Sequence, residues 1–353
     1  MKVTWFDTRK EVPKWHSAEF HEEKHLLRYL PGEPRAPYLI PALVDMHVHG
    51  INGIDVMDGD IEQMAMELKK TGIEWFCPTT ISASFEKLRS LLEKTATNRN
   101  GVIGFHLEGP YLNDKYAGAQ PAQFFRKPNI SEINEYFSEH LHKISVMTLA
   151  PELEGALQTI EFLSNEKIIV NAGHTDANYE IMQKAFEKGL SGITHFYNAM
   201  RPFHHREPGC VGFGWMNNIN CEIIYDRIHV SKNAMDILLK LKSIENIVAV
   251  SDGTKLSGTP DGTETEMWGR TVRKQNGASR SEDGTLCGSA VTLFDVFQNL
   301  WRDYACDKTI SVLACSYNPR RILRLPPPKL WLLLDENANM LDTFEGELSF
   351  ALE

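Results

Sequence analysis

The sequence of 353 residues lacks several features that would define a class of protein at once. It holds only six cysteines and no Cys-x-x-Cys pair, so neither a zinc knuckle nor a disulfide framework is indicated. No apolar run is long enough to cross a bilayer, and residues 1–12 show no apolar signal region. We therefore expect a cytoplasmic protein whose cysteines are reduced.

Positive charge is also scarce. Lysine and arginine number 37 against 47 acidic residues, which leaves a net charge of −10. This balance argues against general binding to nucleic acid or to a membrane surface, so an anionic substrate would need a local basic site. Residues 201–206, Arg-Pro-Phe-His-His-Arg, are such a cluster. Arginine suits phosphate recognition, although an ordinary solvated loop can carry the same residues.

From residue 38 onward, apolar segments alternate with stretches that have helical periodicity. The segments expected to form strands are 38–44, 75–79, 102–106, 144–149, 168–172, 193–196, 222–228 and 247–250. Two of the helices between them are indicated by a stripe of Phe85, Leu88 and Leu92 and by Ser231, a good N-cap. Eight such units predict a TIM-like (β/α)8 barrel of the α/β class, with a doubly wound open sheet as the alternative.

The two ends of the chain differ from this pattern. Short strands are expected within 1–38, and a stiff triple proline at 326–328 precedes further strands. We expect residues 1–38 and 325–353 to form one small β-domain, beside a metal-dependent barrel over 39–324. Within the barrel, the segment 253–288 is rich in Gly, Thr and Asp and is expected to be a long loop.

Ligand-type side chains follow several of the expected strands. His47 and His49 end the first strand and, being one residue apart, point to the same side. Glu108 and His174 follow the third and fifth strands, and His195 lies at the end of the sixth. Each residue alone would more often be an ordinary strand-end side chain. Together, one carboxylate and two imidazoles are typical of catalytic zinc with an open position for water.

Asp252 follows the eighth strand, where an unpaired carboxylate would be costly unless it reaches solvent. A solvated loop aspartate is one interpretation, and a metal ligand or a proton acceptor for metal-activated water is the other. The ligand positions follow strands spread around a ring. A closed barrel brings such strand ends together at its carboxyl-terminal mouth, which favours the barrel over the open sheet.

Five motifs together suggest a family. They are His47-x-His49, His-Leu-Glu-Gly-Pro at 106–110, Gly-His at 173–174, Thr-His-x-x-Asn-Ala-Met at 194–200 and Ser-Asp at 251–252. In this order, over roughly residues 39–320, they resemble the N-acetylglucosamine-6-phosphate deacetylases of the amidohydrolase superfamily. The resemblance implies hydrolysis of the N-acetyl group by a metal-activated water, with an amino sugar phosphate and acetate as products.

The resemblance also implies roles for individual residues. The residues implied to hold one or two divalent ions are Glu108, His174, His195, His47, His49 and Asp252. The residues implied to contact the sugar phosphate are Asn198, Ala199, Arg206 and His229. Zinc is the first expectation for the metal, with iron, manganese and cobalt as alternatives. Asp252 would move the proton. Arg206 would reach the site of a neighbouring subunit, which implies a homodimer.

Three positions depart from the pattern of the family. Gln120 stands where relatives have a histidine that polarises the amide carbonyl. We assign it the same catalytic role, with weaker stabilisation of the transition state because glutamine cannot become cationic. Arg227 replaces a glycine and could crowd the pocket or add a phosphate contact. Residues 325–328 replace a Gly-rich segment.

Two rival functions stay open. One is an amidohydrolase acting on a cyclic amide or an N-acyl amino acid, which the basic cluster disfavours because such substrates need no phosphate contact. The other is a metal-stabilised protein that binds a sugar phosphate with little turnover, which Gln120 keeps open.

Overall fold

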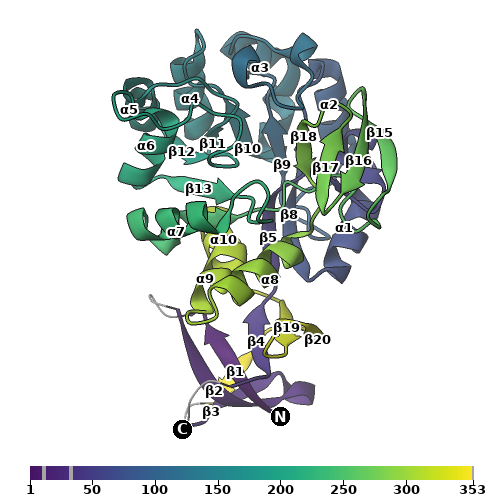
Figure 1. The fold of residues 1–353 in the computed structure, drawn as a ribbon. Helices are drawn as coiled ribbons and strands as arrows, with labels where there is room; N and C mark the ends of the chain where they lie inside the picture. Colours follow the sequence, from purple (N-terminus) through teal and green to yellow (C-terminus); the bar gives the residue numbers. More distant parts are fainter. Residues whose placement is uncertain (10–12, 32–34, 352–353) are drawn as a thin grey trace.

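The computed structural model describes residues 1–9, 13–31 and 35–351. Its centre is an eight-stranded parallel sheet in which neighbouring strands follow one another along the chain (Figure 1). The strands are β5 (Leu43–Val48), β8 (Ile73–Thr80), β9 (Phe105–Glu108), β10 (Ile144–Leu149), β11 (Ile169–Ala172), β12 (Leu190–Ile193), β13 (Asn220–Ile223) and β14 (Ile247–Ala249). The predicted α/β barrel is confirmed.

The ring closes at its carboxyl-terminal mouth. The Asp252 amide donates to the His47 carbonyl at 2.8 Å, and the His49 amide donates to the Gly253 carbonyl at 2.7 Å. The segment after β14 therefore pairs with the end of β5, the first strand of the sheet. This closure places the residues that follow the first and last strands beside one another.

Helices surround the strands. They are α1 (Ile61–Lys70), α2 (Phe85–Lys94), α3 (Ile130–Phe137), α4 (Ala156–Asn165), α5 (Tyr179–Glu187), α6 (Gly209–Met216), α7 (Lys232–Leu241), α8 (Leu293–Asp303), α9 (Thr309–Val312) and α10 (Asn318–Ile322). The predicted stripe of α2 is buried, and Ser231 accepts the Ala234 amide at the start of α7, as expected of an N-cap. Helix formation here follows local sequence signals.

Two apolar cores hold the barrel. A large core lies between strands and helices, and a smaller one contains Val44, Met46, Cys77, Ile103, Val146, Ile224, Val248 and Val250. The smaller core draws its buried members from strands or strand flanks and none from α1–α8, so it fills the inside of the ring. Because the interior is packed with side chains, a ligand can enter only at the mouth.

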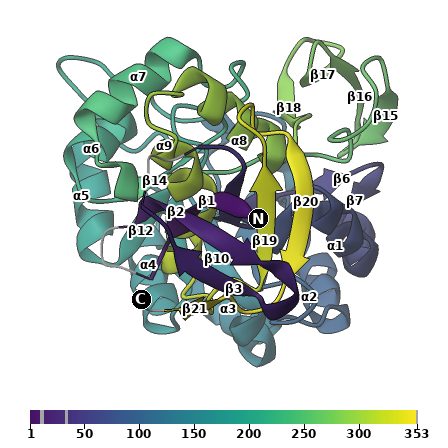
Figure 2. The ribbon, with the colours of Figure 1, turned by 90° about the horizontal axis from the view of Figure 1, so that it is seen from below.

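The chain ends form a second, seven-stranded sheet, as predicted (Figure 2). Its strands are β1 (Lys2–Asp7), β2 (Lys14–His21), β3 (Leu26–Tyr29), β4 (Tyr38–Pro41), β19 (Leu330–Leu334), β20 (Met340–Glu345) and β21 (Ser349–Ala351). β19 lies antiparallel between β4 and β20 and so joins the two ends of the chain. Trp5, Phe20, Leu27 and Trp331 are buried in its own core.

Several strand predictions need correction. The strand expected over 38–44 is wrong, because it merges β4 of the small sheet with the start of β5. Those expected over 102–106, 193–196 and 222–228 are misplaced, since β9 begins at Phe105 and β12 and β13 end at Ile193 and Ile223. The chain leaves β12 because His195 has a left-handed backbone (φ 34°), which a strand cannot accommodate.

The long loop expected over 253–288 is also wrong. It contains an antiparallel sheet of β15 (Glu264–Met267), β16 (Arg270–Gln275), β17 (Ala278–Ser281) and β18 (Leu286–Ser289). We call it the mouth sheet, because it stands beside the barrel mouth (Figure 1). Asn276-Gly277, with φ angles of 52° and 75°, makes the tight turn between β16 and β17 that such a pair favours.

Short connections complete the fold. A two-stranded hairpin of β6 (Gly50–Ile51) and β7 (Ile54–Asp55) follows the two histidines, and a π-helical segment over Leu313–Tyr317 joins α9 to α10. Among the helices of the described part of the chain, none combines the length and the apolar character needed to traverse a bilayer.

Candidate metal centre

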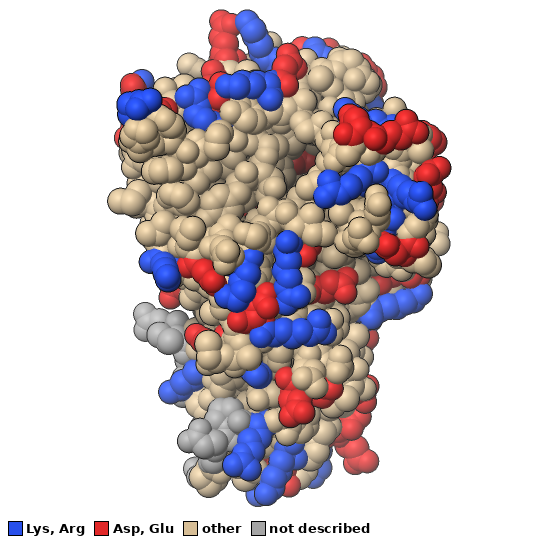
Figure 3. Space-filling model, viewed as in Figure 1, with Lys and Arg blue, Asp and Glu red and all other residues tan. Residues whose placement is uncertain are grey.

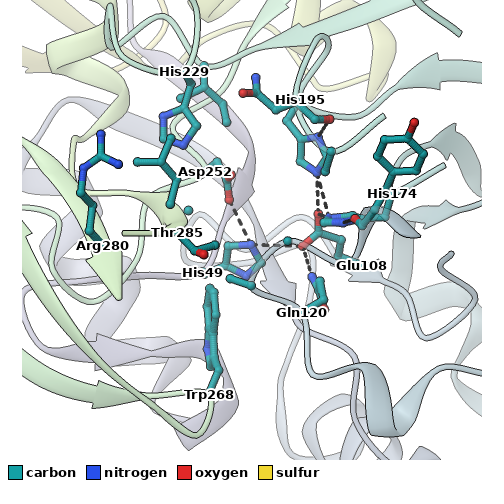
Figure 4. Close-up of a pocket in the computed structure, with 18 of the residues that line it drawn as sticks. His49, Glu108, Gln120, His174, His195, His229, Asp252, Trp268, Arg280 and Thr285 are labelled. Atoms are coloured by element: carbon teal, nitrogen blue, oxygen red, sulfur yellow. Dashed lines mark hydrogen bonds and ion pairs between the residues drawn. The ribbon is translucent and has the colours of Figure 1, made fainter. Parts of the chain in front are cut away.

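A cavity of about 540 Å³ opens between the barrel mouth and the mouth sheet, where the molecule is visibly hollowed (Figure 3). Its wall on the barrel side carries His49, Glu108, His174, His195 and Asp252. The close-up shows these side chains pointing toward one another (Figure 4). The structure therefore brings together residues that are as much as 203 positions apart in the sequence, from His49 to Asp252.

Glu108, His174 and His195 form the first group of ligating atoms. Both histidine Nε2 atoms lie 3.1 Å from Glu108 Oε1, and they lie 3.0 Å from each other. All three side chains are buried. This is the one-carboxylate, two-imidazole arrangement that the sequence predicts.

His47, His49 and Asp252 form the second group. The two Nε2 atoms are 3.2 Å apart, and Asp252 Oδ1 lies 3.4 Å from that of His47 and 3.1 Å from that of His49. Glu108 Oε2 is 3.3 Å from His49 Nε2, so this carboxylate joins the two groups. The geometry offers two neighbouring cation sites that share Glu108.

The other ring nitrogen, Nδ1, of each histidine faces a hydrogen-bond acceptor. The acceptors are the Glu222 carboxylate for His47 (3.3 Å) and the carbonyls of Thr79 for His49 (3.1 Å), Tyr116 for His174 (2.7 Å) and Asn198 for His195 (3.0 Å). Each Nδ1 can donate to that acceptor, and each Nε2 points into the site. Pairs of Nε2 atoms at 3.0–3.2 Å from each other, beside carboxylate oxygens, fit a divalent cation.

The charges in the site support the same interpretation. Burial raises the pKa of Glu108, but the charge of His47 and hydrogen bonds from His174 and His195 bring it well below its usual range. Burial likewise raises the pKa of Asp252, whereas the charges of His47 and His49 lower it to about 2. Burial lowers the pKa of His49, while Asp252 and Glu108 raise it to about 9. Two ionised carboxylates buried together require positive charge between them.

Strained backbone aims three of these side chains. His174, His195 and Asp252 have φ angles of 46°, 34° and 48°, which non-glycine residues rarely adopt. Gly173, just before His174, is packed so closely that an added Cβ would lie 2.6 Å from Thr148 Cγ2. The chain therefore turns sharply at the strand ends and directs the ligating atoms into the mouth.

Gln120 lies beside the first group. Its Nε2 donates to Glu108 Oε2 at 2.6 Å, and its Oε1 accepts the Ser82 amide at 2.8 Å. This pair of bonds fixes the orientation of the amide group and leaves its second N–H for the cavity. His106, by contrast, bonds to the Met46 carbonyl and to Thr148 Oγ1 and packs its ring 4.6 Å from that of His47.

The residues expected to contact the sugar phosphate divide into two sets. Asn198, Ala199 and His229 line the cavity. Arg206 is exposed and lies outside the cavity lining, with Nη1 3.0 Å from His205 Nε2. The structure does not bring Arg206 to the site of its own chain.

Arg227 also lies outside the cavity lining. Its guanidinium forms two bonds of 2.8 Å with the Asp303 carboxylate on α8. It therefore neither crowds the pocket nor adds a phosphate contact, and both expectations were wrong. Its backbone is left-handed (φ 68°), a conformation that glycine adopts without strain.

Sequence reasoning missed four residues at the site. Glu222 bonds to His47, and Asp45 accepts the Ser251 hydroxyl at 2.6 Å and so anchors the segment before Asp252. Trp268 and Arg280 line the cavity from the mouth sheet, and the Trp268 ring contacts His49 at 5.1 Å between centroids. Asn276-Gly277 was the available signal for Arg280, because it marks the hairpin that carries this residue.

A (β/α)8 barrel whose mouth carries two groups of imidazole and carboxylate ligands joined by one glutamate defines a metal-dependent hydrolase of the amidohydrolase class. No protein-family model matches the chain. Over 303 residues, it is 33% identical to the N-acetylglucosamine-6-phosphate deacetylase of Lysinibacillus sphaericus. The aligned region covers 83% of this chain and 78% of that protein.

Two further comparisons agree. Over 306 residues, the chain is 34% identical to the N-acetylgalactosamine-6-phosphate deacetylase of Escherichia coli O157:H7. The aligned region covers 82% of this chain and 79% of that protein. The solved structure of the Thermotoga maritima N-acetylglucosamine-6-phosphate deacetylase matches with a TM-score of 0.86 and 30% identity, over 98% of this chain and 97% of that one. The chain belongs to the N-acetylglucosamine-6-phosphate deacetylase family.

Proposed function

We propose that this protein hydrolyses N-acetylglucosamine 6-phosphate to glucosamine 6-phosphate and acetate. The observation that carries the proposal is the pair of ligand groups joined by Glu108 and facing the cavity together with Asp252. The family supports the substrate class. An N-acetylgalactosamine 6-phosphate substrate is the second candidate, because a relative that acts on that epimer is as similar to the chain as those that act on the glucose epimer.

Glu108, His174 and His195 would hold the first divalent ion, and His47, His49 and Asp252 would hold a second beside it. Such an ion would lower the pKa of a bound water toward neutrality and would polarise the acetamide carbonyl. Zinc is our first proposal because nitrogen and oxygen ligands of this kind suit it, with iron, manganese and cobalt as alternatives.

The residues of the chain supply the proton transfer. The attacking water forms a bond to the carbonyl carbon and gives its proton to the Asp252 carboxylate, which is ionised. Asp252 then donates that proton to the nitrogen as the carbon–nitrogen bond breaks, so that acetate and the free amine leave. The unused N–H of Gln120 faces the cavity and can donate to the carbonyl oxygen as negative charge develops there.

The experiment measures acetate release from N-acetylglucosamine 6-phosphate, its galactose epimer and unphosphorylated N-acetylglucosamine, with and without a chelator. We expect release from a phosphorylated sugar in preference to the unphosphorylated one, and its loss with chelator. Binding of the phosphorylated sugars without acetate release would instead favour the non-enzymatic rival. Release from neither phosphorylated sugar would overturn the proposal.

We also propose that two copies of the chain form a homodimer. Exposed apolar side chains lie on α6 and on the segment before it, where Phe203 and Met216 are 48% and 75% exposed and Phe203 packs on Trp215. Figure 3 shows a broad uncharged face over this part of the molecule. Arg206 belongs to the same segment. Light scattering should give twice the mass of the chain, and Met216→Glu should lower it toward the monomer.

A cytoplasmic location is a further part of the proposal. It is supported by the six cysteines, all of which are free thiols and five of which are buried. Free buried thiols are typical of a reducing compartment.

A further inference from the structure

The described residues place two permanent cations in the cavity lining, Lys115 and Arg280. Lys115 Nζ forms an ion pair with Asp176 at 2.9 Å, so its charge is already balanced. Arg280 is half-buried and donates from Nη1 to the Gly284 carbonyl at 3.0 Å. Within the described part of the chain, no carboxylate forms an ion pair with it. Arg280 is therefore a cavity cation without a counter-charge.

The position of Arg280 carries a cost for the fold. In the mouth sheet, Arg280 on β17 stands directly opposite Arg273 on β16. Like charges facing each other across antiparallel strands are destabilising. Arg273 is exposed and lies outside the cavity lining, so only Arg280 reaches the cavity. Glu264 on β15 stands opposite Arg273 on its other side, so the sheet pairs a carboxylate with Arg273 but none with Arg280. A bound anion at Arg280 would offset the remaining repulsion.

A second basic group lies next to Arg280. The His229 ring is held by Asp226, whose Oδ2 lies 2.6 Å from Nδ1, while Oδ1 of the same carboxylate accepts the His229 amide at 2.7 Å. Burial lowers the pKa of His229, Asp226 raises it above its usual value, and the nearby charge of Arg280 opposes the rise. Figure 4 shows Arg280 and His229 on the side of the cavity away from Glu108 and His174.

We propose that Arg280 binds the phosphate of the substrate together with His229, so that the chain that holds the metal also supplies a phosphate anchor. The inference rests on the proposed function and assigns a residue that determines its substrate class. The planar guanidinium offers paired N–H donors that match phosphate oxygens. With the phosphate held at this side, the acetamide of the same molecule can face the ligand groups that Glu108 joins (Figure 4).

The test compares Arg280→Met, Arg280→Lys and the matched control Arg273→Met, which removes the same charge from the paired position on the neighbouring strand. kcat and KM for acetate release are measured with the phosphorylated and the unphosphorylated N-acetyl sugar. For Arg280→Met we expect kcat/KM for the phosphorylated sugar to fall by about 10- to 100-fold, mainly through KM. The kcat/KM for the unphosphorylated sugar should fall by a much smaller factor, and this rate also reports that the active site is folded.

Arg280→Lys should recover part of the loss, because it restores the charge without the fork of donors. Inhibition by glucosamine 6-phosphate should weaken in Arg280→Met and remain at the wild-type level in Arg273→Met.

An Arg280→Met enzyme that keeps the wild-type preference for the phosphorylated sugar would overturn the inference and leave the proposed function standing. An equal loss in Arg273→Met would also overturn it, because the effect would then be one of general charge. A wild-type protein that hydrolyses neither phosphorylated sugar would instead overturn the proposed function.

Discussion

At the scale of single residues, the site depends on backbone that ordinary side chains avoid. His174, His195 and Asp252 are all left-handed, and conformations of this kind cost of order 1–3 kcal/mol each. Each stands just after a buried apolar strand whose packing holds it in place. Hydrogen bonds from Nδ1 to backbone carbonyls then fix the rings of His174 and His195. The positions of the ligating atoms are therefore set before any ion arrives.

Asp252→Asn tests the proton transfer. The amide keeps an oxygen for the second group of ligands but cannot accept the proton from water. We expect kcat to fall by about 10²- to 10⁴-fold, the usual contribution of general acid–base catalysis. Because Glu108, His174 and His195 are untouched, the first ion should remain bound. Acetate release and metal content are measured on the same preparation. Retained activity would contradict the role assigned to Asp252.

Gln120→Ala tests the neighbouring donor. The substitution removes the bond to Glu108 and the N–H that faces the cavity. Loss of one donor that stabilises developing negative charge typically lowers kcat by about 10²- to 10³-fold. We expect a fall in this range, with Gln120→His retaining more activity than Gln120→Ala. Steady-state kinetics on the three proteins would refute the role if Gln120→Ala kept the wild-type kcat.

The sequence allowed the ligand residues to be predicted because each follows an apolar run in a fold whose strand ends meet. The structure brings together all six residues predicted as ligands. Glu222 and Asp45 could not be found in the same way. They lie inside strands, where the sequence shows one acidic residue among apolar neighbours, and only the three-dimensional structure pairs Glu222 with His47.

At the scale of elements, the mouth sheet was the largest omission. Its strands are polar and short, because much of their surface faces solvent or the cavity, so their hydrophobic period is weak. The turn residues between the strands were the sequence feature that indicated the sheet. Trp268-Gly269 and Asn276-Gly277 both have positive φ angles at the two positions between paired strands. The sheet is held by a small core that includes Leu256, Met267 and Val272.

The segment after β13 is tied to α8 by one partly buried cluster. Asp303 at the end of α8 accepts the Tyr225 hydroxyl at 2.7 Å and pairs with Arg227. Burial raises the pKa of Asp303, but the hydrogen bonds from Arg227 and Tyr225 bring it below its ordinary value. A carboxyl whose pKa is lower in the folded state stabilises the fold above the ordinary pKa of 3.8, and this contribution is lost as the pH falls through the folded-state value.

Asp303→Asn should therefore lower the free energy of unfolding at neutral pH by about 1–2 kcal/mol. The difference between the variant and the wild type should shrink as the pH falls below 3.8, because protonated Asp303 then loses the same interaction. Urea unfolding at a series of pH values measures both. A difference that stays constant with pH would show that the charge of Asp303 contributes nothing.

At the scale of the whole molecule, the barrel gathers carboxylates and imidazoles at one side of the cavity, and the mouth sheet places the guanidinium of Arg280 at the other. The eight-stranded ring was predictable from the β-α alternation, and its closure from the spread of the ligand positions. The small sheet was predictable because regular β-α units are missing at both ends of the chain. The strand predicted over 38–44 was wrong because one continuous apolar run was interpreted as one strand, whereas Ala42 separates β4 from β5.

The central claim is that the two groups of ligands hold the divalent ions on which hydrolysis depends. It is tested most directly by stripping the protein of metal and following acetate release from the phosphorylated N-acetyl sugar as zinc is added back. We expect no activity at the start, then a rate that rises with added zinc and reaches a plateau at one or two ions per chain. A metal-stripped protein that works at the full rate would contradict the account.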